Sequence, residues 1–450
     1  MSTETRHDYV QDLVLPTVLF AALGGMTWAV RGCSGYGGSM GCLFAGVTWG
    51  TAWWFIAREP GEIQSRRYTS GWIILALTIG IGMAGARGWM QWPSFFAGRL
   101  MTNAAQNEFV PISRAYGFLW LFIAGMPWAG LGACMLAWCG AERPANAWRI
   151  AMRWTLRFAC GFAGVVIAKH LLDTYPEMFH PLYKSIAAKY EDLENNPSLK
   201  RLLSDNRAAI AHMGMYLGFL AFEAARLHRK NVILIVTVGT VNGLGWALLQ
   251  NWKWAPGLFG GDIFNWWRCW ESSGGISIGV AYGIAYFLVN RKMSESEKAT
   301  LEVSWASDHP RLERFGAYLG LLLGLGLSLR SGLKGWANIY LGNEEYWSHV
   351  LWLVFGPLLI IGLLWLVVRT FFVPGKEYFE DDAMPHAYAI MWLVLIVQNV
   401  CAQLVTGPKS HPGELAFSIY YLVLFAVTGW IVYRYQREKR GPVRIAQAQH

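Results

Sequence analysis

The sequence predicts an all-α polytopic membrane protein with about twelve transmembrane helices. Of its 450 residues, 54% are hydrophobic and only 15% are charged, whereas a soluble protein carries about 25% charged residues. Twelve apolar stretches are long enough to cross a bilayer, which takes about 20 residues each. The segments between them are too short for a sizeable soluble domain, so we expect the chain to act within the membrane.

Alternating these stretches across the bilayer from a cytoplasmic N-terminus separates the basic residues. Of the 38 Lys and Arg residues, 23 fall inside, and six of the other 15 lie in one long outside segment, 169–207. Cytoplasmic loops carry the excess of Lys and Arg, so we expect an integral protein of a bacterial inner membrane with both termini in the cytoplasm. Membrane orientation then explains the net charge of +9 without a nucleic-acid partner. The stretches centre on residues 14–31, 39–57, 71–88, 116–139, 154–172, 208–227, 232–250, 273–290, 313–331, 350–371, 387–406 and 414–433.

The two halves of the chain resemble each other. The segment "GGMTWAVRG" at 24–32 aligns with "NGLGWALLQ" at 242–250. We interpret this as a duplication that produced two parallel six-helix repeats, residues 1–229 and 230–450, an arrangement found in many secondary transporters. Chance alignment of frequent Gly and Trp residues is the alternative. At one constant offset in the next stretch, Gly41, Gly46, Gly50 and Arg58 match Gly274, Gly279, Gly283 and Arg291.

Glycines spaced four apart predict close contact between helices. Gly46 and Gly50 share one helix face, as do Gly275, Gly279 and Gly283. Small residues at this spacing let neighbouring backbones approach closely. Helix packing is the simpler interpretation, and a sliding interface between the two halves is the functional one.

Three arginines end glycine-rich helices near the predicted external face. Arg31, Arg87 and Arg330 lie at membrane depth, where a charge is costly unless it is paired or hydrated. Arg87 and Arg330 adjoin Trp89 and Trp336. Guanidinium groups beside aromatic rings suit an anionic, ring-containing ligand. The alternative is that each long side chain extends to the membrane surface.

The stretch "NWWRCWESSGG", residues 265–275, is the strongest anomaly of composition. Trp266, Trp267 and Trp270 surround Arg268 and Glu271. Indoles stack on sugar rings and charged groups fix their orientation, so the stretch predicts one wall of a carbohydrate-like site. An interfacial belt also favours Trp, which makes membrane anchoring the alternative.

Polar residues also occur at the external ends of the predicted fifth and eleventh helices. Gln398 and Asn399 indicate a polar lining, since hydrocarbon would leave their donors unpaired, and hydrogen bonding between helices is the alternative. Lys169, His170 and Asp173 occupy the corresponding place in the first half. A cavity between the halves would explain both sets.

Glu223 lies inside the sixth predicted helix, three residues before Arg226. That spacing places both on one helix face, which predicts a structural salt bridge. The functional alternative is that Glu223, with Lys169, His170 and Asp173, couples ion movement to transport.

The cysteines predict neither a metal nor a cofactor. Seven occur without a CxxC pair or a zinc-binding spacing. Cys33 and Cys269 are expected at the external face, where a disulfide is an alternative to two free thiols.

These features favour a secondary transporter that moves a small anionic or carbohydrate-like solute, such as a sugar or a carboxylate, through a cavity between two six-helix halves. The architecture is similar to that of the major facilitator superfamily, but the loop at 58–70 lacks that family's Gly, Asp-Arg and Gly-Arg spacing, so membership is not inferred. The alternative is a membrane-embedded transferase that acts on lipid-linked sugar or acyl donors at the outer face. The oligomeric state is left open.

Overall fold

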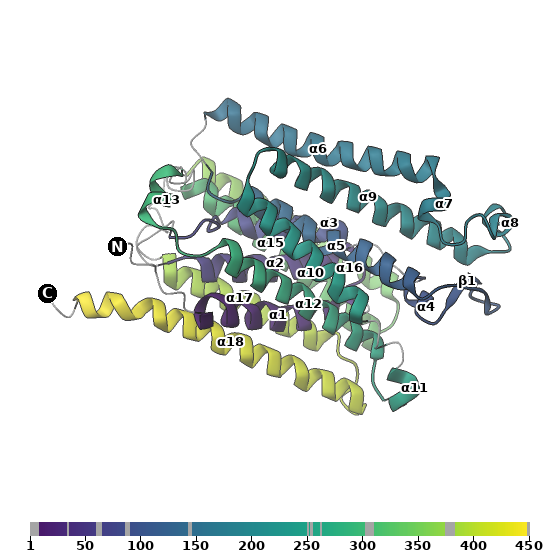
Figure 1. The fold of residues 1–450 in the computed structure, drawn as a ribbon. Helices are drawn as coiled ribbons and strands as arrows, with labels where there is room; N and C mark the ends of the chain where they lie inside the picture. Colours follow the sequence, from purple (N-terminus) through teal and green to yellow (C-terminus); the bar gives the residue numbers. More distant parts are fainter. Residues whose placement is uncertain are drawn as a thin grey trace.

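The chain forms one bundle of long helices (Figure 1). The computed structural model describes residues 9–33, 36–59, 65–85, 91–142, 146–249, 252, 255–261, 263–301, 310–373 and 383–447. Within these ranges, eleven helices are long and apolar enough to cross a membrane, and α3 adds a shorter apolar helix of 13 residues. The predicted all-α polytopic membrane protein is therefore confirmed.

Each predicted stretch coincides with one of these helices, but several helices continue beyond the hydrocarbon length. Polar residues extend α6 and α9 at their N-terminal ends. The helices are η1 (Val10–Val14), α1 (Leu15–Arg31), α2 (Ser39–Ala57), α3 (Trp72–Ala84), α5 (Ala115–Trp138), α6 (Ala147–Thr174), α9 (Pro197–Ala225), α10 (Arg229–Leu248), α12 (Trp266–Val289), α15 (Pro310–Tyr340), α16 (Glu344–Phe371), α17 (Ala383–Leu404) and α18 (Pro412–Gln447).

Short elements cover one end of the bundle, at the right of Figure 1. The strands β1 and β2 pair antiparallel, and Trp92 of α4 donates from Nε1 to Asn206 Oδ1 of α9 at 2.8 Å. We call this the predicted external end, and the opposite end, where α1 begins and α18 ends, the predicted cytoplasmic end. The short elements at the predicted external end are α4 (Trp92–Phe95), β1 (Arg99–Asn103), β2 (Glu108–Pro111), α7 (Pro176–Phe179), α8 (Ala187–Glu191) and α11 (Ala255–Phe259), whereas α13 (Glu295–Thr300) lies at the opposite end.

Glycines allow the central helices to touch through their backbones, as the spacing predicted. A Cβ at Gly275 of α12 would overlap the carbonyl oxygen of Gly24 on α1, and a Cβ at Gly46 of α2 would overlap that of Leu77 on α3. Helix packing by these glycines is therefore confirmed. The duplication stays a prediction; residues 1–229 and 230–450 share one bundle, because α1 packs along α12 and α5 along α10.

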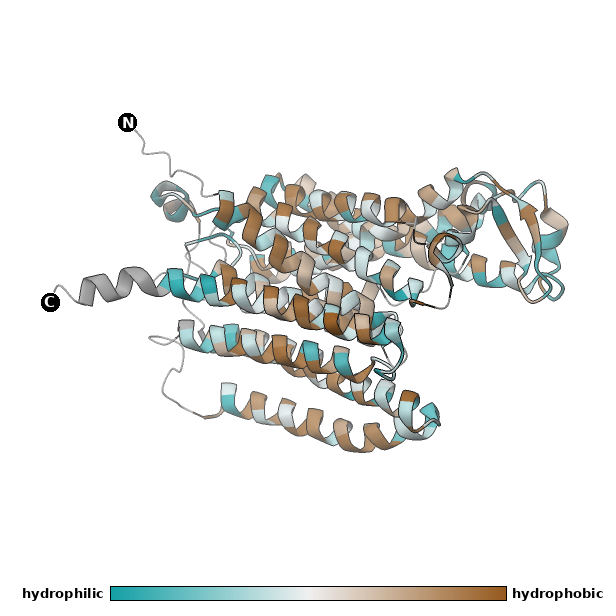
Figure 2. Cartoon of the chain, turned by 90° about the horizontal axis from the view of Figure 1, so that it is seen from below, coloured by the Kyte–Doolittle hydropathy of each residue, from teal (hydrophilic) through white to brown (hydrophobic). Residues whose placement is uncertain are grey.

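Two long helices lie at the periphery. Only 11% of the apolar stretch of α6 is buried, and only 6% of that of α16. Both helices expose many apolar side chains, and hydrophobic residues are frequent along all the long helices (Figure 2). Exposed apolar surface of this extent marks a lipid or protein contact. The main contact of α6 is with α9, and that of α16 is with α15.

Candidate functional site

Arg31 and Glu271, 240 positions apart, form a buried ion pair between α1 and α12. Arg31 Nη1 donates to the two carboxylate oxygens of Glu271 at 3.1 and 3.3 Å, and Nη2 donates to the Gly85 carbonyl oxygen at 2.6 Å. The guanidinium also lies 5.1 Å from the ring centre of Trp28. Because each charge has the other as its partner, the pair needs no ligand to exist at this depth.

Arg268 pairs in the same way with an acid of another helix. Its Nη1 donates to Glu414 Oε2 at 2.8 Å, and the backbone N–H of Gly407 donates to that oxygen at 2.7 Å. The guanidinium lies 4.8 Å from the ring centre of Phe417. This pair joins α12 to the start of α18. The two charges of the stretch 265–275, Arg268 and Glu271, therefore both hold helices together.

The tryptophans of that stretch differ in their surroundings. Trp270 is buried and meets Trp246 edge-on at 5.2 Å and Trp267 at 4.9 Å between ring centres. Trp266 stacks on Trp252 at 6.2 Å and donates from Nε1 to the Gly260 carbonyl oxygen at 3.0 Å. Trp270 therefore belongs to the core, whereas Trp266 lies nearer the surface.

Arg330 and Trp336 lie on α15. Arg330 Nη2 donates to the Ser348 carbonyl oxygen at 2.8 Å and to its Oγ at 2.5 Å, and the guanidinium lies 4.4 Å from the ring centre of Trp352. Trp336 is 38% exposed and contacts the Tyr340 ring. Arg330 thus secures α16 to α15.

The predicted amide lining forms hydrogen bonds between helices. Gln398 Nε2 donates to the Leu23 carbonyl oxygen at 2.9 Å, and Asn399 Nδ2 donates to that of Tyr421 at 3.2 Å. On α6, Lys169 is half-buried and His170 is exposed. Asp173 is exposed too and pairs with Arg207 of α9, with Oδ1 at 2.6 Å from Nη1.

Each described arginine that we predicted to bind substrate therefore has a partner within the protein. Arg31 pairs with Glu271, Arg268 pairs with Glu414, and Arg330 bonds to Ser348. Arg87 and Trp89 lie outside the described residues. Cys33 and Cys269 are both free thiols. The external binding site stays a prediction.

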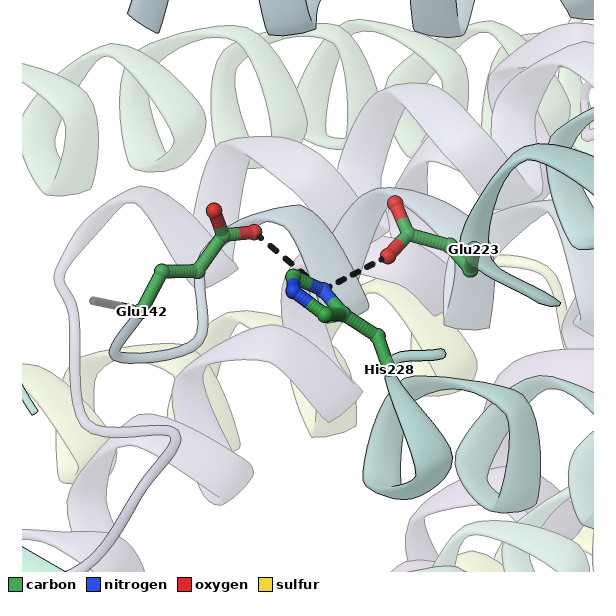
Figure 3. Close-up of side chains that lie close together, drawn as sticks. All are labelled: Glu142, Glu223 and His228. Atoms are coloured by element: carbon green, nitrogen blue, oxygen red, sulfur yellow. Dashed lines mark hydrogen bonds and ion pairs between the residues drawn. The ribbon is translucent and has the colours of Figure 1, made fainter. Parts of the chain in front are cut away.

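A second charged cluster lies at the predicted cytoplasmic end, where α9 turns into α10 (Figure 3). Arg157 of α6 donates from Nε to Glu223 Oε1 at 2.8 Å and from Nη2 to Glu142 Oε1 at 2.6 Å. His228 Nδ1 is 3.1 Å from Glu223 Oε2, and Asn231 Nδ2 donates to that oxygen at 2.8 Å. We call these five residues the ion network; the Glu223 side chain is fully buried within it.

The predicted salt bridge between Glu223 and Arg226 is wrong in its partner. Arg226 pairs with Glu142, with Nη2 at 3.5 Å from Oε2, and Glu223 pairs with Arg157. Arg226 directly follows α9, and both oxygens of Glu223 are already taken by Arg157, His228 and Asn231. Glu223 of α9, the sixth predicted helix, instead pairs with Arg157 of α6, the fifth predicted helix.

The turn between α9 and α10 places His228 against Glu223. Leu227 has φ of +57°, in the left-handed region where glycine is usual. The N–H of His228 donates to the Glu223 carbonyl oxygen at 3.1 Å, which closes the helix end. A leucine in this conformation costs about 1–3 kcal/mol, and such strain clusters at functional sites.

The donor set of Glu142, Glu223 and His228 brings its ligand atoms within 4.8 Å of one another, which is close enough for a metal ion. However, Arg157, Arg153 and Arg226 contact the same carboxylates. These guanidinium groups neutralise both acids and would repel a divalent cation. The ion network therefore fits a metal poorly.

A cavity of about 870 Å³ opens beside the ion network, with Glu142 and His228 in its wall. Burial opposes ionisation of Glu142, yet Arg157 and Arg226 hold its pKa below the usual range. Arg226 Nη1 and Arg67 Nε are buried without a hydrogen-bond partner among the described residues. Apart from Glu142 and Glu297, the charged lining is cationic, and we call this space the basic cavity; it is lined by Arg67, Arg149, Arg153, Arg226, Arg229 and Lys230.

One sequence signal pointed to this cavity, the excess of Lys and Arg in inside segments. Glu142, Arg157 and His228 were not singled out, because Arg157 meets Glu223 across 66 positions and His228 reaches Glu223 only through the turn after α9. Comparisons with protein-family models, curated proteins and solved structures found no match for this chain. The geometry of its own residues therefore carries the functional argument.

Proposed function

We propose that this protein is a secondary transporter for a small anionic solute, and that the basic cavity is where the solute binds at the predicted cytoplasmic end. The observation that carries the proposal is the composition of the cavity wall, with six cationic side chains and two acids. A buried guanidinium nitrogen without a hydrogen-bond partner favours an anion as its missing acceptor. Arg226 provides such an atom at Nη1, while its Nη2 pairs with Glu142.

The position of the cavity also supports transport. Its lining comes from residues 67–229 of the first predicted half and from Lys230, Met293, Glu297 and Leu301 of the second, so it touches both predicted halves. Secondary transporters bind solute near the bilayer midplane where two repeats meet, and a cavity at the cytoplasmic end would be the entrance to such a site. A solute bound here would contact both repeats.

The test is uptake and binding in proteoliposomes, with succinate and inorganic phosphate as anionic probes and glucose as the neutral one. We expect the anions to bind and to exchange across the membrane. Arg226→Gln should weaken anion binding at least tenfold. Arg226→Lys keeps the charge but loses the planar fork, so it should recover only part of the affinity. Arg207→Gln, at the other end of α9, is the matched control and should bind normally.

Failure of all anions to bind to the unmodified protein would overturn the proposal. So would equal binding by the Arg226→Gln variant and the unmodified protein. Glucose uptake that Arg226→Gln leaves unchanged would point back to the carbohydrate-like site predicted at the external end.

A membrane-embedded transferase is the second candidate function, and His228 is the observation that favours it. The Glu223 carboxylate accepts a hydrogen bond from Nδ1–H, which leaves Nε2 as the basic nitrogen of a residue that lines the cavity. A carboxylate that orients a histidine is the arrangement of many general bases. Turnover of an anionic donor by detergent-solubilised protein, lost in His228→Gln, would favour the transferase over the transporter.

A further inference from the structure

A second space adjoins the basic cavity and is lined mostly by apolar side chains. Its volume is about 490 Å³, within the usual range of about 300–1,000 Å³ for ligand sites. We call it the apolar groove; α3 contributes Trp72, Ala76 and Ile79, and α6 contributes Trp154 and Phe158. Arg67, Glu142 and Arg153 line both spaces, so the groove and the cavity adjoin at their charged end.

The groove faces the membrane. Three of its lining side chains are exposed on the surface of the bundle: Ile79 is 37% exposed, Trp154 38% and Phe158 52%. The backbone of α6 packs mainly along α9. Towards the centre of the bundle, Trp154 and Phe158 of α6 meet Trp138 of α5 only edge-on, and the groove lies beside this contact. In a bilayer this opening meets acyl chains.

The lining of the two spaces changes in order along α6. Arg149 lines the basic cavity, Arg153 lines both spaces, and Trp154, Arg157 and Phe158 follow in the groove. Tryptophan at this boundary is typical of the membrane interface, and Trp148 is 70% exposed beside the cavity. The cavity is therefore at headgroup level and the groove at the level of the first chain carbons.

We propose that the ligand of the basic cavity is an anionic amphiphile, whose head binds the arginines while its chain lies in the apolar groove. This inference rests on the proposed anion site and names its substrate class. The cationic side chains of the cavity attract a phosphate or carboxylate head. The adjoining apolar groove can hold a hydrocarbon chain attached to that head. A soluble anion would use the cavity alone.

The chain contribution can be measured with alkyl phosphates of increasing length. The full chain is placed in nanodiscs of neutral phosphatidylcholine, and binding of inorganic, butyl, hexyl and octyl phosphate is titrated against empty nanodiscs as the blank. A methylene that leaves water for an apolar site strengthens binding about fourfold. We expect affinity to rise with length after the blank is subtracted.

Two tryptophan substitutions locate that contribution. Ala76→Trp fills the groove and should make affinity independent of chain length, while inorganic phosphate still binds. Ala163→Trp, on the exposed face of α6, is the matched control and should keep the dependence. Should Ala76→Trp fail to fold, Ile79→Trp at the groove mouth replaces it. A diazirine on the octyl chain should label α3 and α6.

The outcomes separate the two proposals. If all four phosphates bind equally, the amphiphile is wrong and the anion site stands. If none binds, the anion site and the amphiphile both fail. Equal labelling of α16, another lipid-facing helix, would mean that the probe reports bulk lipid, which also overturns the groove assignment.

Discussion

The buried pair of Arg157 and Glu223 should be far more costly to break than the exposed pair of Arg207 and Asp173, although both join α6 to α9. The exposed fractions are 2% and 0% for the first two side chains and 50% and 54% for the second two. Removing one member of a buried pair leaves an uncompensated charge and costs about 3–5 kcal/mol. An exposed pair contributes about 0–1 kcal/mol.

The perturbation is Arg157→Met, which keeps much of the side-chain volume and removes the guanidinium. Glu223 would retain Asn231 at 2.8 Å and His228 at 3.1 Å, but no arginine. We expect the free energy of unfolding to fall by about 3–5 kcal/mol. Arg207→Met, the control, should lower it by no more than about 1 kcal/mol.

The assay is reversible unfolding of the purified protein in mixed micelles, followed by tryptophan fluorescence. The double variant Arg157→Met with Glu223→Gln removes the stranded charge and should recover at least half of the loss, because glutamine still accepts from Asn231. Equal losses for Arg157→Met and Arg207→Met would refute the reasoning. Failure of the double variant to recover stability would instead show that packing of the Arg157 side chain carried the effect.

Three other predictions follow from the same structure. Gly275→Ala should lower the unfolding free energy by about 1–3 kcal/mol, because its Cβ would overlap the α1 backbone. Gly356→Ala, the control, places its Cβ in open space and should raise the unfolding free energy by up to about 1 kcal/mol. Equal effects of the two variants would contradict the helix contact. Burial lowers the pKa of His180 from 6.5 to about 4, so between pH 6.5 and 4 the unfolded chain binds a proton that the folded protein does not. The contribution of neutral His180 to stability should therefore be fully present above pH 6.5 and decrease as the pH drops towards 4. Thermal unfolding of His180→Gln should lack this dependence. Arg31→Gln should reduce stability, with recovery when Glu271→Gln is added; a stable Arg31→Gln variant that no longer binds an anion would favour the external site instead.

The sequence was sufficient for the transmembrane helices and for their closest contacts. A run of about 20 apolar residues has few alternatives in a membrane, because every backbone group must be satisfied within the segment. Gly275, Gly279 and Gly283 predict a helix contact from local sequence too. Their spacing of four places all three on one helix face, where the absence of side chains lets another backbone approach. The hairpin β1–β2 carried no such signal, because its strands of five and four residues are too short to show a clear alternation of apolar and polar residues.

The charge partners could not be predicted from spacing. Arg31 meets Glu271 across 240 positions and Arg157 meets Glu223 across 66, so only tertiary packing brings them together. Local spacing suggested Arg226 for Glu223 and was wrong, because Arg157 of α6 reaches Glu223 and Arg226 instead meets Glu142. The basic cavity was hidden for a related reason: its cations come from separate loops and helix ends.

The two ends of the bundle use charge differently. At the predicted external end, Arg31 and Arg268 are neutralised by Glu271 and Glu414, so those residues act mainly on the packing of α1, α12 and α18. At the other end the cavity wall keeps more cations than acids. Membrane orientation requires only that positive charge stay on one side, and a flat surface would serve that purpose equally well. The concave arrangement of these residues, with Arg226 Nη1 buried and unsatisfied, goes beyond that requirement, and the proposed anionic ligand would account for the difference.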